Sequence, residues 1–572
     1  MKKQKVGDLL IQYHKWQNDD YRELCKSLNE HMNIKEIQSY MPIMALYFYY
    51  HNTPKSHKII DFKRRYYINN IININTSKNS YYNSNKLLEG SVYDSVDNVK
   101  YNKEMFLKIL PILDPITYMM NNYNRYPKRN QYLPCNYNYN TSHKLNSMEN
   151  SAYLDSYMTF IGNHLKETKK LPCFANYYGG FNGVIKNFSY DITEEFHSFK
   201  NEKWFNSTIG KIFSIDVYHS DSEDEDEESE YLDDLKVDEE DITDMSEGGD
   251  NENEIVNAIV KDTIENLVDD VVEHIVDDLS KETNETKVCG LMDKYINIDD
   301  SINDCISPHS RSNSSNSNSS NSSNSSNSSY FSNRDYVVNI RDFPVQMIFM
   351  EKFEETLEDI LEDDYDEKLI KSIMFQVIFA LAYLQKHFDF THNDLHINNV
   401  MYANTDQKFL YYKINNQYFK VPTYGKVAKI IDFGRAIFTI KNKVFFNDVF
   451  SKYGEAEGQY THPINPIYYN ILKKSQKTNY KPNYSFDLCR LATTMIEFIK
   501  EEDSELLKLL TRMSTDCNGD NLNECDDSFD LYIKIAHNAN KAIPKDLIGN
   551  KYFKEYKVNK KNIFKKSVIY SM

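Results

Sequence analysis

FTHNDLHINNVM, at positions 390–401, is the stretch that decides the fold, and IIDFGRA follows it at positions 430–436. The first stretch has the pattern H-x-D-L-x-x-x-N, which places Asp394 five residues before Asn399 in a single loop. The second places Asp432 at the end of an apolar run that is typical of a buried strand. Phosphoryl transfer from a nucleotide needs one carboxylate to orient the attacking hydroxyl and two oxygen ligands for Mg²⁺. The two stretches therefore predict a cleft in which Asp394 is that carboxylate and Asn399 and Asp432 are the metal ligands.

Together these motifs resemble those of the protein-kinase superfamily, over roughly residues 87–190 and 336–540. The DFG triplet that begins at Asp432, and Asp487 in FDLCRLA, place the chain closer to protein kinases than to small-molecule kinases. In its long inserts and its HNDLH variant the chain is similar to the predicted serine/threonine kinases of giant DNA viruses. The resemblance implies an α+β fold of two lobes, a small β-rich lobe and a large helical lobe. It also implies that Asp487 anchors the catalytic loop through hydrogen bonds to its backbone.

The catalytic loop departs from the protein-kinase pattern at two positions. His396 stands where protein kinases usually have a lysine that contacts the γ-phosphate, and an imidazole is a weaker counter-charge than an ammonium group. The form D-L-H-x-x-N resembles haspin-like kinases and the aminoglycoside and choline kinases, so His396 joins Asp394 and Asn399 as a catalytic candidate. Asn393 replaces the arginine that would pair with a phosphorylated activation loop. We therefore predict no dependence on phosphorylation of segment 437–484.

The resemblance also assigns residues that would bind the nucleotide, ATP. The strand-like stretch MFLKIL at positions 105–110 carries Lys108, which would contact the α- and β-phosphates. A surface lysine on an edge strand is the alternative. A helix is expected over residues 150–165 because its apolar residues recur at helical spacing. That helix would supply Asp155 as the acidic partner of Lys108, with Glu149 as the second choice.

Two further parts of the nucleotide site follow from the same resemblance. In LEGSVYDSV at positions 88–96, Gly90 would let a phosphate-covering loop approach closely, and Val92 would lie over the base. This stretch has one glycine rather than the three of the kinase pattern. The backbone groups of Glu351 and Phe353 would bind the adenine, although both could equally be ordinary positions of a core strand.

Changes in composition divide the chain into segments. Residues 221–244 hold 15 acidic residues and one lysine, and residues 312–329 form a Ser/Asn repeat with nothing to bury. Residues 1–50 are expected to be helical, and the Asn/Tyr-rich stretch 66–86 is expected to be a linker. The predicted units are an N-terminal helical extension with its linker (residues 1–86), the first part of the small lobe (87–190) and a largely disordered acidic and Ser/Asn-rich insertion (191–335). They continue with the end of the small lobe and the hinge (336–356), the large lobe (357–545) and a basic C-terminal tail (546–572).

The formal net charge of −18 is concentrated in the acidic run, and the rest of the chain carries only about −4. Nucleic acid is therefore not indicated as a partner. Residues 541–566 hold nine lysines and could contact an anionic partner, but a solvated terminal face is the simpler interpretation. Eight cysteines without a C-x-x-C pair, a polar N-terminus and the lack of an 18-residue apolar stretch predict a reducing intracellular compartment and no membrane span. That compartment would be the host cytoplasm if the protein is viral, or else a virion.

Three functions are compatible with these features. The first is ATP- and Mg²⁺-dependent transfer of a phosphoryl group to Ser or Thr hydroxyls of a protein. The second is a pseudokinase that serves as a scaffold, which the glycine-poor loop and His396 favour. The third is a small-molecule kinase of the aminoglycoside or choline type. His392 and His396, with an acid between them, also suggest a metalloprotease, but that motif needs a glutamate where this chain has Asn393.

Overall fold

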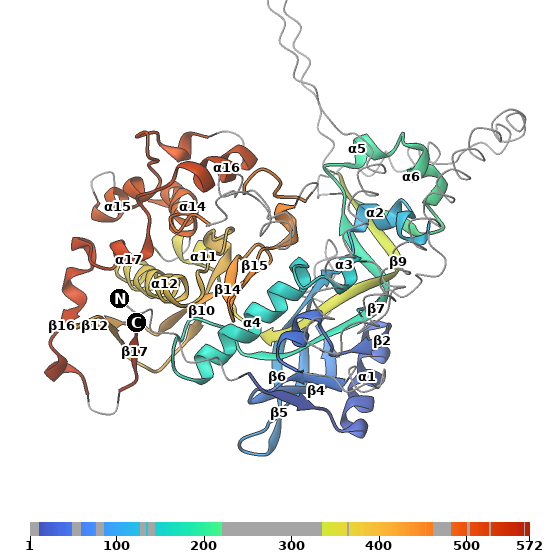
Figure 1. Cartoon of the computed structure of the whole chain (residues 1–572), viewed down its shortest axis with the longest axis horizontal. Coiled ribbons are helices and arrows are strands. Elements are labelled where there is room, and N and C mark those ends of the chain that lie inside the picture. Colours follow the sequence, from blue (N-terminus) through green and yellow to red (C-terminus); the bar gives the residue numbers. More distant parts are fainter. Residues whose placement is uncertain are drawn as a thin grey trace, which may run out of the picture. The chain divides into compact units, whose positions relative to one another are not determined.

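The structure of the chain is a computed structural model, and it has a mixed α+β fold with a curled antiparallel sheet and a set of helices (Figure 1). The predicted α+β class is therefore confirmed. The acidic run and the Ser/Asn repeat lie outside the described residues, so their predicted disorder stays a prediction. The structure describes residues 11–48, 59–75, 85–125, 133–134, 143–219, 334–362, 365–451, 454–460, 482–499, 504–525, 528–564 and 567–572.

The largest sheet has seven antiparallel strands. Its central strand is β9, in which five consecutive side chains from Val345 to Phe349 are fully buried. Such a run on both faces of a strand places it in the interior of the sheet. In spatial order the strands are β2 (Ile34–Gln38), β7 (Tyr177–Asp191), β9 (Arg334–Glu351), β6 (Val99–Pro111), β5 (Lys86–Asp94) and β4 (Tyr66–Ile74), with β8 (Phe213–His219) also paired to β9.

Helix α4 (Ser151–Glu167) confirms the helix expected over residues 150–165. The side chain of Asn150 caps it by accepting the backbone N–H of Ala152. Most of its side chains are buried, because α4 packs against β7 and also against the hairpin of β14 (Phe438–Ile440) and β15 (Lys443–Phe445). Figure 1 shows α4 running alongside both of these strand groups.

The N-terminal segment differs from its prediction in three places, the first of which is strand β1 (Tyr13–Lys15), paired with β3 (Ile60–Phe62). Helix α1 (Asn18–Met32) is followed by strand β2, which pairs with β7 instead of continuing the helical pattern. Residues 66–74, expected in a linker, form β4. The Ser27 hydroxyl of α1 accepts the Ile71 N–H and donates to the Ile71 C=O, so the helix covers the outer edge of β4. The Asn-rich composition concealed a strand whose apolar side chains, Ile68 and Ile71, are buried.

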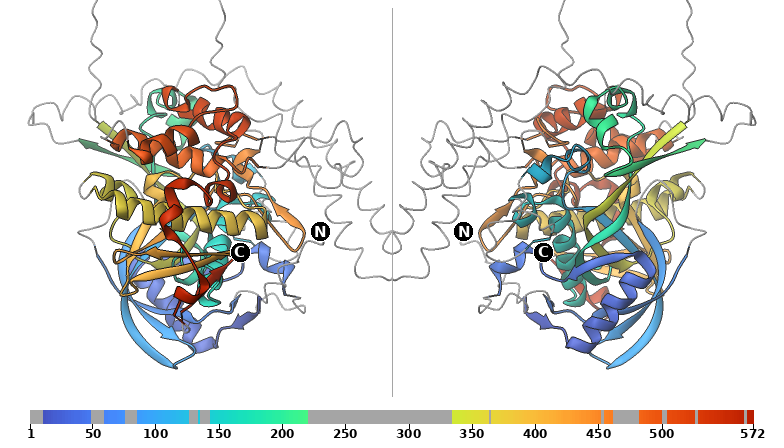
Figure 2. Two further views of the ribbon diagram at one scale, coloured as in Figure 1. Left: turned by 90° about the vertical axis from the view of Figure 1, so that its left-hand side faces the viewer. Right: turned by 90° about the vertical axis from the view of Figure 1, so that its right-hand side faces the viewer.

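The second half of the chain supplies most of the other helices and several short strands. Helix α12 buries most of its side chains, and Figure 2 shows it beside the strands that follow it. Asn415 and Asn416 form the tight turn that joins β11 and β12, and Asn415 has φ 53°. The helices are α11 (Leu357–Glu362), α12 (Glu367–Phe388), α14 (Phe486–Met495), α15 (Glu505–Met513), α16 (Ser528–Asn538) and α17 (Pro544–Leu547), and the strands are β10 (Val400–Asn404), β11 (Phe409–Ile414), β12 (Gln417–Pro422), β13 (Lys426–Ile430), β16 (Lys557–Val558) and β17 (Ile569–Ser571).

The start of the predicted insertion and the basic C-terminal tail both contain regular elements. After β7 the chain forms α5 (Phe196–Phe199) and α6 (Lys203–Thr208), and Phe196 stacks on Tyr336 with ring centroids 3.7 Å apart. The first part of the predicted disordered insertion is therefore folded. At the C-terminus, β16 pairs with β12 and β17 pairs with β11, and the Phe553 side chain is fully buried. The aromatic side chains of this tail pack into the core, while its lysines at 551, 554 and 557 are exposed, as expected for a solvated basic face.

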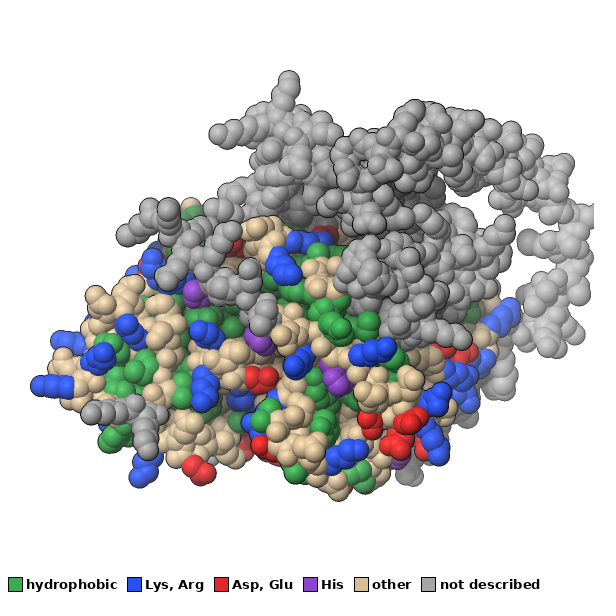
Figure 3. Space-filling model, turned by 60° about the horizontal axis from the view of Figure 1, so that its bottom comes forward, with side chains coloured by type: hydrophobic (Ala, Val, Ile, Leu, Met, Phe, Trp, Pro, Cys, Tyr) green, Lys and Arg blue, Asp and Glu red, His purple; other side chains and the backbone are tan. Residues whose placement is uncertain are grey.

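On the face drawn in Figure 3, positive and negative side chains of the described residues are interspersed. Hydrophobic side chains lie in small groups between them. None of the helices in the described part of the chain is both long and apolar enough to cross a bilayer.

A buried ion pair holds the start of β4. The side chains of Arg64 and Asp61 are both fully buried, and Arg64 Nη2 lies 2.9 Å from Asp61 Oδ2. The Arg64 guanidinium also donates to the backbone oxygens of Phe62, Tyr66 and Tyr178. It therefore joins the N-terminal segment to β7, and its charge depends on Asp61 for compensation.

We predict that Asp61→Ala lowers the free energy of unfolding by about 3–5 kcal/mol, because it leaves a buried guanidinium without its counter-charge. The matched control is Asp19→Ala, which removes the partner of Arg22 in a pair whose side chains are 80 % and 94 % exposed. Urea denaturation followed by circular dichroism should show a lower midpoint only for Asp61→Ala. Equal midpoints for the two variants would contradict the structural role of this pair.

Candidate active site

The loop that carries Asp394 leads directly into β10, which pairs antiparallel with β13. Strand β10 begins at Val400, which is paired with Ile430 at the end of β13. The ladder extends one step further, because the Ile431 N–H donates to the Asn399 C=O over 3.2 Å. Asn399 and Asp432 therefore lie at neighbouring strand ends, and the pairing brings the two predicted metal ligands together.

Asp487, at the start of α14, fixes the backbone of this loop through hydrogen bonds. Its carboxylate accepts the His392 N–H with both oxygens and the Asn393 N–H with Oδ1, each over 3.0 Å. The expected backbone contact of Asp487 is thus confirmed. Burial raises the pKa of Asp487, while His392 and the two backbone donors act in the opposite direction. The centroid of the His392 ring lies 5.5 Å from that of Phe433, and its Nε2 atom is hydrogen-bonded to the Ile431 carbonyl, so His392 has a structural role in the loop.

Lys108 lies between two carboxylates. Its Nζ atom is 2.6 Å from Asp155 Oδ2 and 2.9 Å from Asp432 Oδ1. The second oxygen of Asp155 accepts the Phe433 N–H over 3.0 Å, which ties α4 to the residue after Asp432. Strand β6, helix α4 and the end of β13 therefore meet at one ammonium group.

The side chains of Asp155, Lys108 and Asp432 differ in how much of their surface is exposed to solvent. Asp155 is 1 % exposed, Lys108 13 % and Asp432 41 %. Burial alone would raise the pKa of Asp432, but the positive charge of Lys108 outweighs it and holds this pKa at about 2. Burial opposes the charge of Lys108 too, yet its two carboxylates keep its pKa above the usual value. Asp432 is therefore an ionised carboxylate that is accessible to a metal ion.

The side chain of Asn399 is oriented within the loop. Its Nδ2 group donates to the Asp394 carbonyl over 2.8 Å and lies 3.0 Å from His396 Nε2. Both amide protons are then used, and the oxygen Oδ1 is the atom of this side chain that could bind a metal ion. Burial lowers the pKa of His396, which favours the neutral ring that can accept this bond. The imidazole is thus a support for Asn399 as well as a candidate phosphate contact.

Gly90 and Val92 must be reassigned. They lie in the middle of β5, which is paired on both sides, and not in a loop. Gly90 is opposite Lys103 on β6, an odd number of residues from Lys108, so Gly90 and Val92 face the other side of the sheet. A Cβ atom at position 90 would lie 2.8 Å from Met105 Cε, so this glycine makes room for packing. Residues 76–84, which connect β4 to β5, are outside the described residues.

Glu351 and Phe353 lie where β9 ends. The Glu351 N–H donates to the Asn176 C=O over 2.9 Å, so only its carbonyl could contact a base. Its carboxylate pairs with Lys166 at 2.9 Å, and although burial raises its pKa, the nearby lysines hold this pKa below the usual value. The Phe353 ring lies 5.9 Å from Lys429 Nζ.

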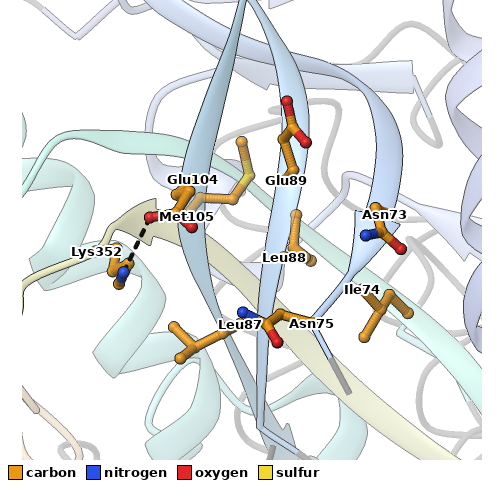
Figure 4. A pocket seen from close by; sticks show the side chains of 9 residues that line it. All are labelled: Asn73, Ile74, Asn75, Leu87, Leu88, Glu89, Glu104, Met105 and Lys352. Carbon is orange, nitrogen blue, oxygen red and sulfur yellow. Dashed lines mark hydrogen bonds and ion pairs between the residues drawn. The ribbon is translucent and has the colours of Figure 1, made fainter. Parts of the chain in front are cut away.

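A pocket of about 430 Å³ lies over the end of β4, the start of β5 and the middle of β6, next to Lys352 (Figure 4). Glu104 and Lys352, which both line it, form an ion pair of 2.9 Å. Neither Lys108 nor Asp432 lines this pocket; Asp432 lines a second cavity, which has room for about one water. The larger pocket is lined by Asn73, Ile74, Asn75, Leu87, Leu88, Glu89, Glu104, Met105 and Lys352.

No protein family model matches the chain. Short segments are similar to curated proteins. A protein named "Probable serine/threonine-protein kinase" from Dictyostelium discoideum is 39 % identical over 85 residues, which cover 14 % of this chain and 7 % of that protein. The serine/threonine-protein kinase haspin of Mus musculus is 31 % identical over 109 residues, which cover 19 % of this chain and 14 % of haspin. An uncharacterized protein of Invertebrate iridescent virus 6 is 38 % identical over 73 residues, or 12 % of each chain. The chain thus spans only a small part of the relatives that it matches.

We predict that Asp487→Ala destabilises the fold by about 3 kcal/mol or more, because two buried N–H groups lose their acceptor and each costs about 1–3 kcal/mol. Asp487→Asn keeps one acceptor oxygen and should cost less. The control is Asp406→Ala at an exposed turn position. Urea denaturation measures all three, and a midpoint for Asp487→Ala no lower than that of the control would refute the anchoring role.

Proposed function

We propose that the chain is an ATP- and Mg²⁺-dependent phosphotransferase of the protein-kinase type, which transfers the γ-phosphoryl group to Ser or Thr hydroxyls of a protein. The observation that carries the proposal is the meeting of Lys108, Asp155 and Asp432 beside the loop of Asp394 and Asn399. The partial similarity to proteins named as serine/threonine kinases supports the same function.

The proposal includes a two-lobed architecture. The seven-stranded sheet and α4 would be the small lobe, built from residues 87–190 and 336–356 with β2 and β4 added. Residues 357–545 would be the large lobe, and Glu351 and Phe353 would lie in the hinge between the two. Segments 191–335 and 546–572 would then be additions to this body.

On the nucleotide side, Asp155 holds Lys108 toward the loop of Asp432. A triphosphate that binds Lys108 would replace its ion pair with Asp432 and release that carboxylate. Asp432 and the Asn399 amide oxygen are the residues that would hold Mg²⁺, which neutralises phosphate charge when it is bound. Two protein ligands suffice, since Mg²⁺ takes its remaining ligands from phosphates and water.

On the acceptor side, Asp394 would accept the proton of the attacking hydroxyl. Its backbone carbonyl is held by the Asn399 amide, and the neighbouring Asn393 N–H is held by Asp487. The carboxylate therefore stands on a fixed backbone, which is what the alignment of an acceptor hydroxyl requires. His396 would contribute at most a hydrogen bond to the phosphate.

A binding module without catalysis is the second candidate. The stretch from Asn75 to Asn85, which joins β4 to β5, contains no glycine. Phosphates are usually approached by a glycine-rich loop at such a place, because a backbone without side chains can come close to them. This observation favours weak or absent transfer with retained nucleotide binding.

We predict that Asp394→Asn lowers phosphoryl transfer to a protein substrate by about 100- to 10,000-fold, because the amide cannot accept the hydroxyl proton. Nucleotide affinity should stay near that of the wild type, since Asp394 contacts the acceptor. Radiolabel transfer from ATP to generic protein substrates measures the first quantity, and calorimetry measures the second.

Asp406→Asn is the matched control for this substitution, because Asp406 is exposed in the turn between β10 and β11. Transfer that survives in Asp394→Asn at the wild-type rate would refute the assigned role. Nucleotide binding without transfer in any variant would support the binding module. Transfer to aminoglycosides or choline, and to no protein, would place the chain among small-molecule kinases.

A second prediction concerns the metal. Asp432→Asn should raise the Mg²⁺ concentration needed for half-maximal transfer by about tenfold or more, because a neutral amide is a weaker ligand than a carboxylate. The transfer rate at saturating ATP, measured over a Mg²⁺ series, tests this, with Asp406→Asn again as control. An unchanged Mg²⁺ requirement would exclude Asp432 as a ligand.

A further inference from the structure

Asp394 has a neighbour that no sequence motif marks. Tyr532, on α16, donates its hydroxyl proton to Asp394 Oδ1 over 2.5 Å. The two residues are 138 positions apart, so tertiary packing alone brings them together. A bond of this length between a hydroxyl and a carboxylate is a charge-assisted hydrogen bond, stronger than one between neutral groups.

The ring of Tyr532 is held in place by contacts from two other elements. The Arg490 guanidinium of α14 lies 5.0 Å from the ring centroid, and that of Arg435 lies 5.4 Å from it. Phe486, at the start of α14, contributes a ring contact of 5.9 Å. Arg490 Nη1 donates to the Thr493 hydroxyl over 3.3 Å, and the guanidinium acts on the Tyr532 hydroxyl as well as on its ring. The hydroxyl is therefore placed by a well-packed side chain.

The two groups have fixed roles in this hydrogen bond. Burial and the negative charge of Asp394 raise the pKa of Tyr532, so its hydroxyl stays protonated and acts as the donor. On Asp394, Oδ1 accepts this bond and the backbone carbonyl accepts from Asn399. Among the described residues the other carboxylate oxygen, Oδ2, has no hydrogen-bond donor. Asp394 Oδ1 is therefore held by a hydrogen bond, and Oδ2 is available to accept one from a substrate.

We propose that Tyr532 is a positioning residue for phosphoryl transfer, whose hydroxyl holds Oδ1 of Asp394 so that Oδ2 faces the acceptor hydroxyl. The inference rests on the proposed function, because that function gives Asp394 its role. In the transfer step the acceptor oxygen bonds to the γ-phosphorus, and the bond from that phosphorus to the bridging oxygen of ADP breaks. The proton of the acceptor hydroxyl passes to Oδ2 of Asp394.

The test is Tyr532→Phe, which keeps the ring between its two arginines and removes only the hydroxyl. The expected result is a fall in kcat of about tenfold or more, because a hydrogen bond to a charged group is lost. The KM values for ATP and for the protein substrate should stay unchanged, since a positioning residue acts through Asp394 and not on either ligand. Nucleotide-binding stoichiometry, measured by calorimetry, should stay at the wild-type value and so exclude a loss of folded protein.

Tyr484→Phe is the matched control. The Tyr484 hydroxyl donates to Asp389 Oδ1 over 2.9 Å, so this substitution also removes a tyrosine–aspartate hydrogen bond, but in an exposed position next to α12. It should leave kcat unchanged. The pair of variants therefore separates an effect on Asp394 from the general cost of such a bond.

Each outcome decides the inference. A Tyr532→Phe variant with kcat equal to that of Tyr484→Phe would overturn it while leaving the proposed function intact. A faster variant would also overturn it, because it would show that the tyrosine hydroxyl competes with the acceptor. A changed KM for the protein substrate with unchanged kcat would make Tyr532 a substrate contact instead. A wild-type chain that transfers no phosphoryl group to any acceptor would overturn both proposals together.

Discussion

The ammonium group of Lys108 is the point on which the arrangement of the site depends. It joins β6 to helix α4 through Asp155 and to the end of β13 through Asp432. A buried cation is stable only when carboxylates compensate for its lost hydration, so each of these elements is held where its carboxylate can reach. Asp432 is the more exposed of the two carboxylates. It can therefore leave this ion pair without becoming a buried charge that lacks a counter-charge.

The parts of the site that the sequence predicted are those that local chemistry specifies. The spacing from Asp394 to Asn399 is a property of one loop, and the apolar run before Asp432 is a property of one strand. Helix α4 follows from its periodicity, whereas Asp155 is assigned on that helix through the resemblance to protein kinases. These features need no knowledge of which strands pair, so a single stretch of sequence contains them.

The parts that could not be predicted depend on pairing and on distant packing. The residues around Gly90 are compatible with a loop or a strand. They form a strand because they pair with β4 on one side and β6 on the other. Once β5 is paired with β6, the two-residue period of a strand turns Gly90 and Val92 away from Lys108. Tyr532 is a common residue in a helix, and only the fold places its hydroxyl against Asp394. No local signal could have marked it.

The N-terminal segment takes part in positioning the same cation. Phe62 stacks on Phe160 of α4 with ring centroids 4.5 Å apart, and the hydroxyl of Tyr47 is hydrogen-bonded to that of Tyr157. An aspartate has one methylene group fewer than a glutamate, so Asp155 reaches Lys108 only if α4 lies close to the sheet. The N-terminal segment packs on another face of α4, and burying that face favours a position of the helix close to the sheet. The described part of the N-terminal segment, through Tyr47 and Phe62, therefore belongs to the structure that sets the distance between Lys108 and its carboxylates.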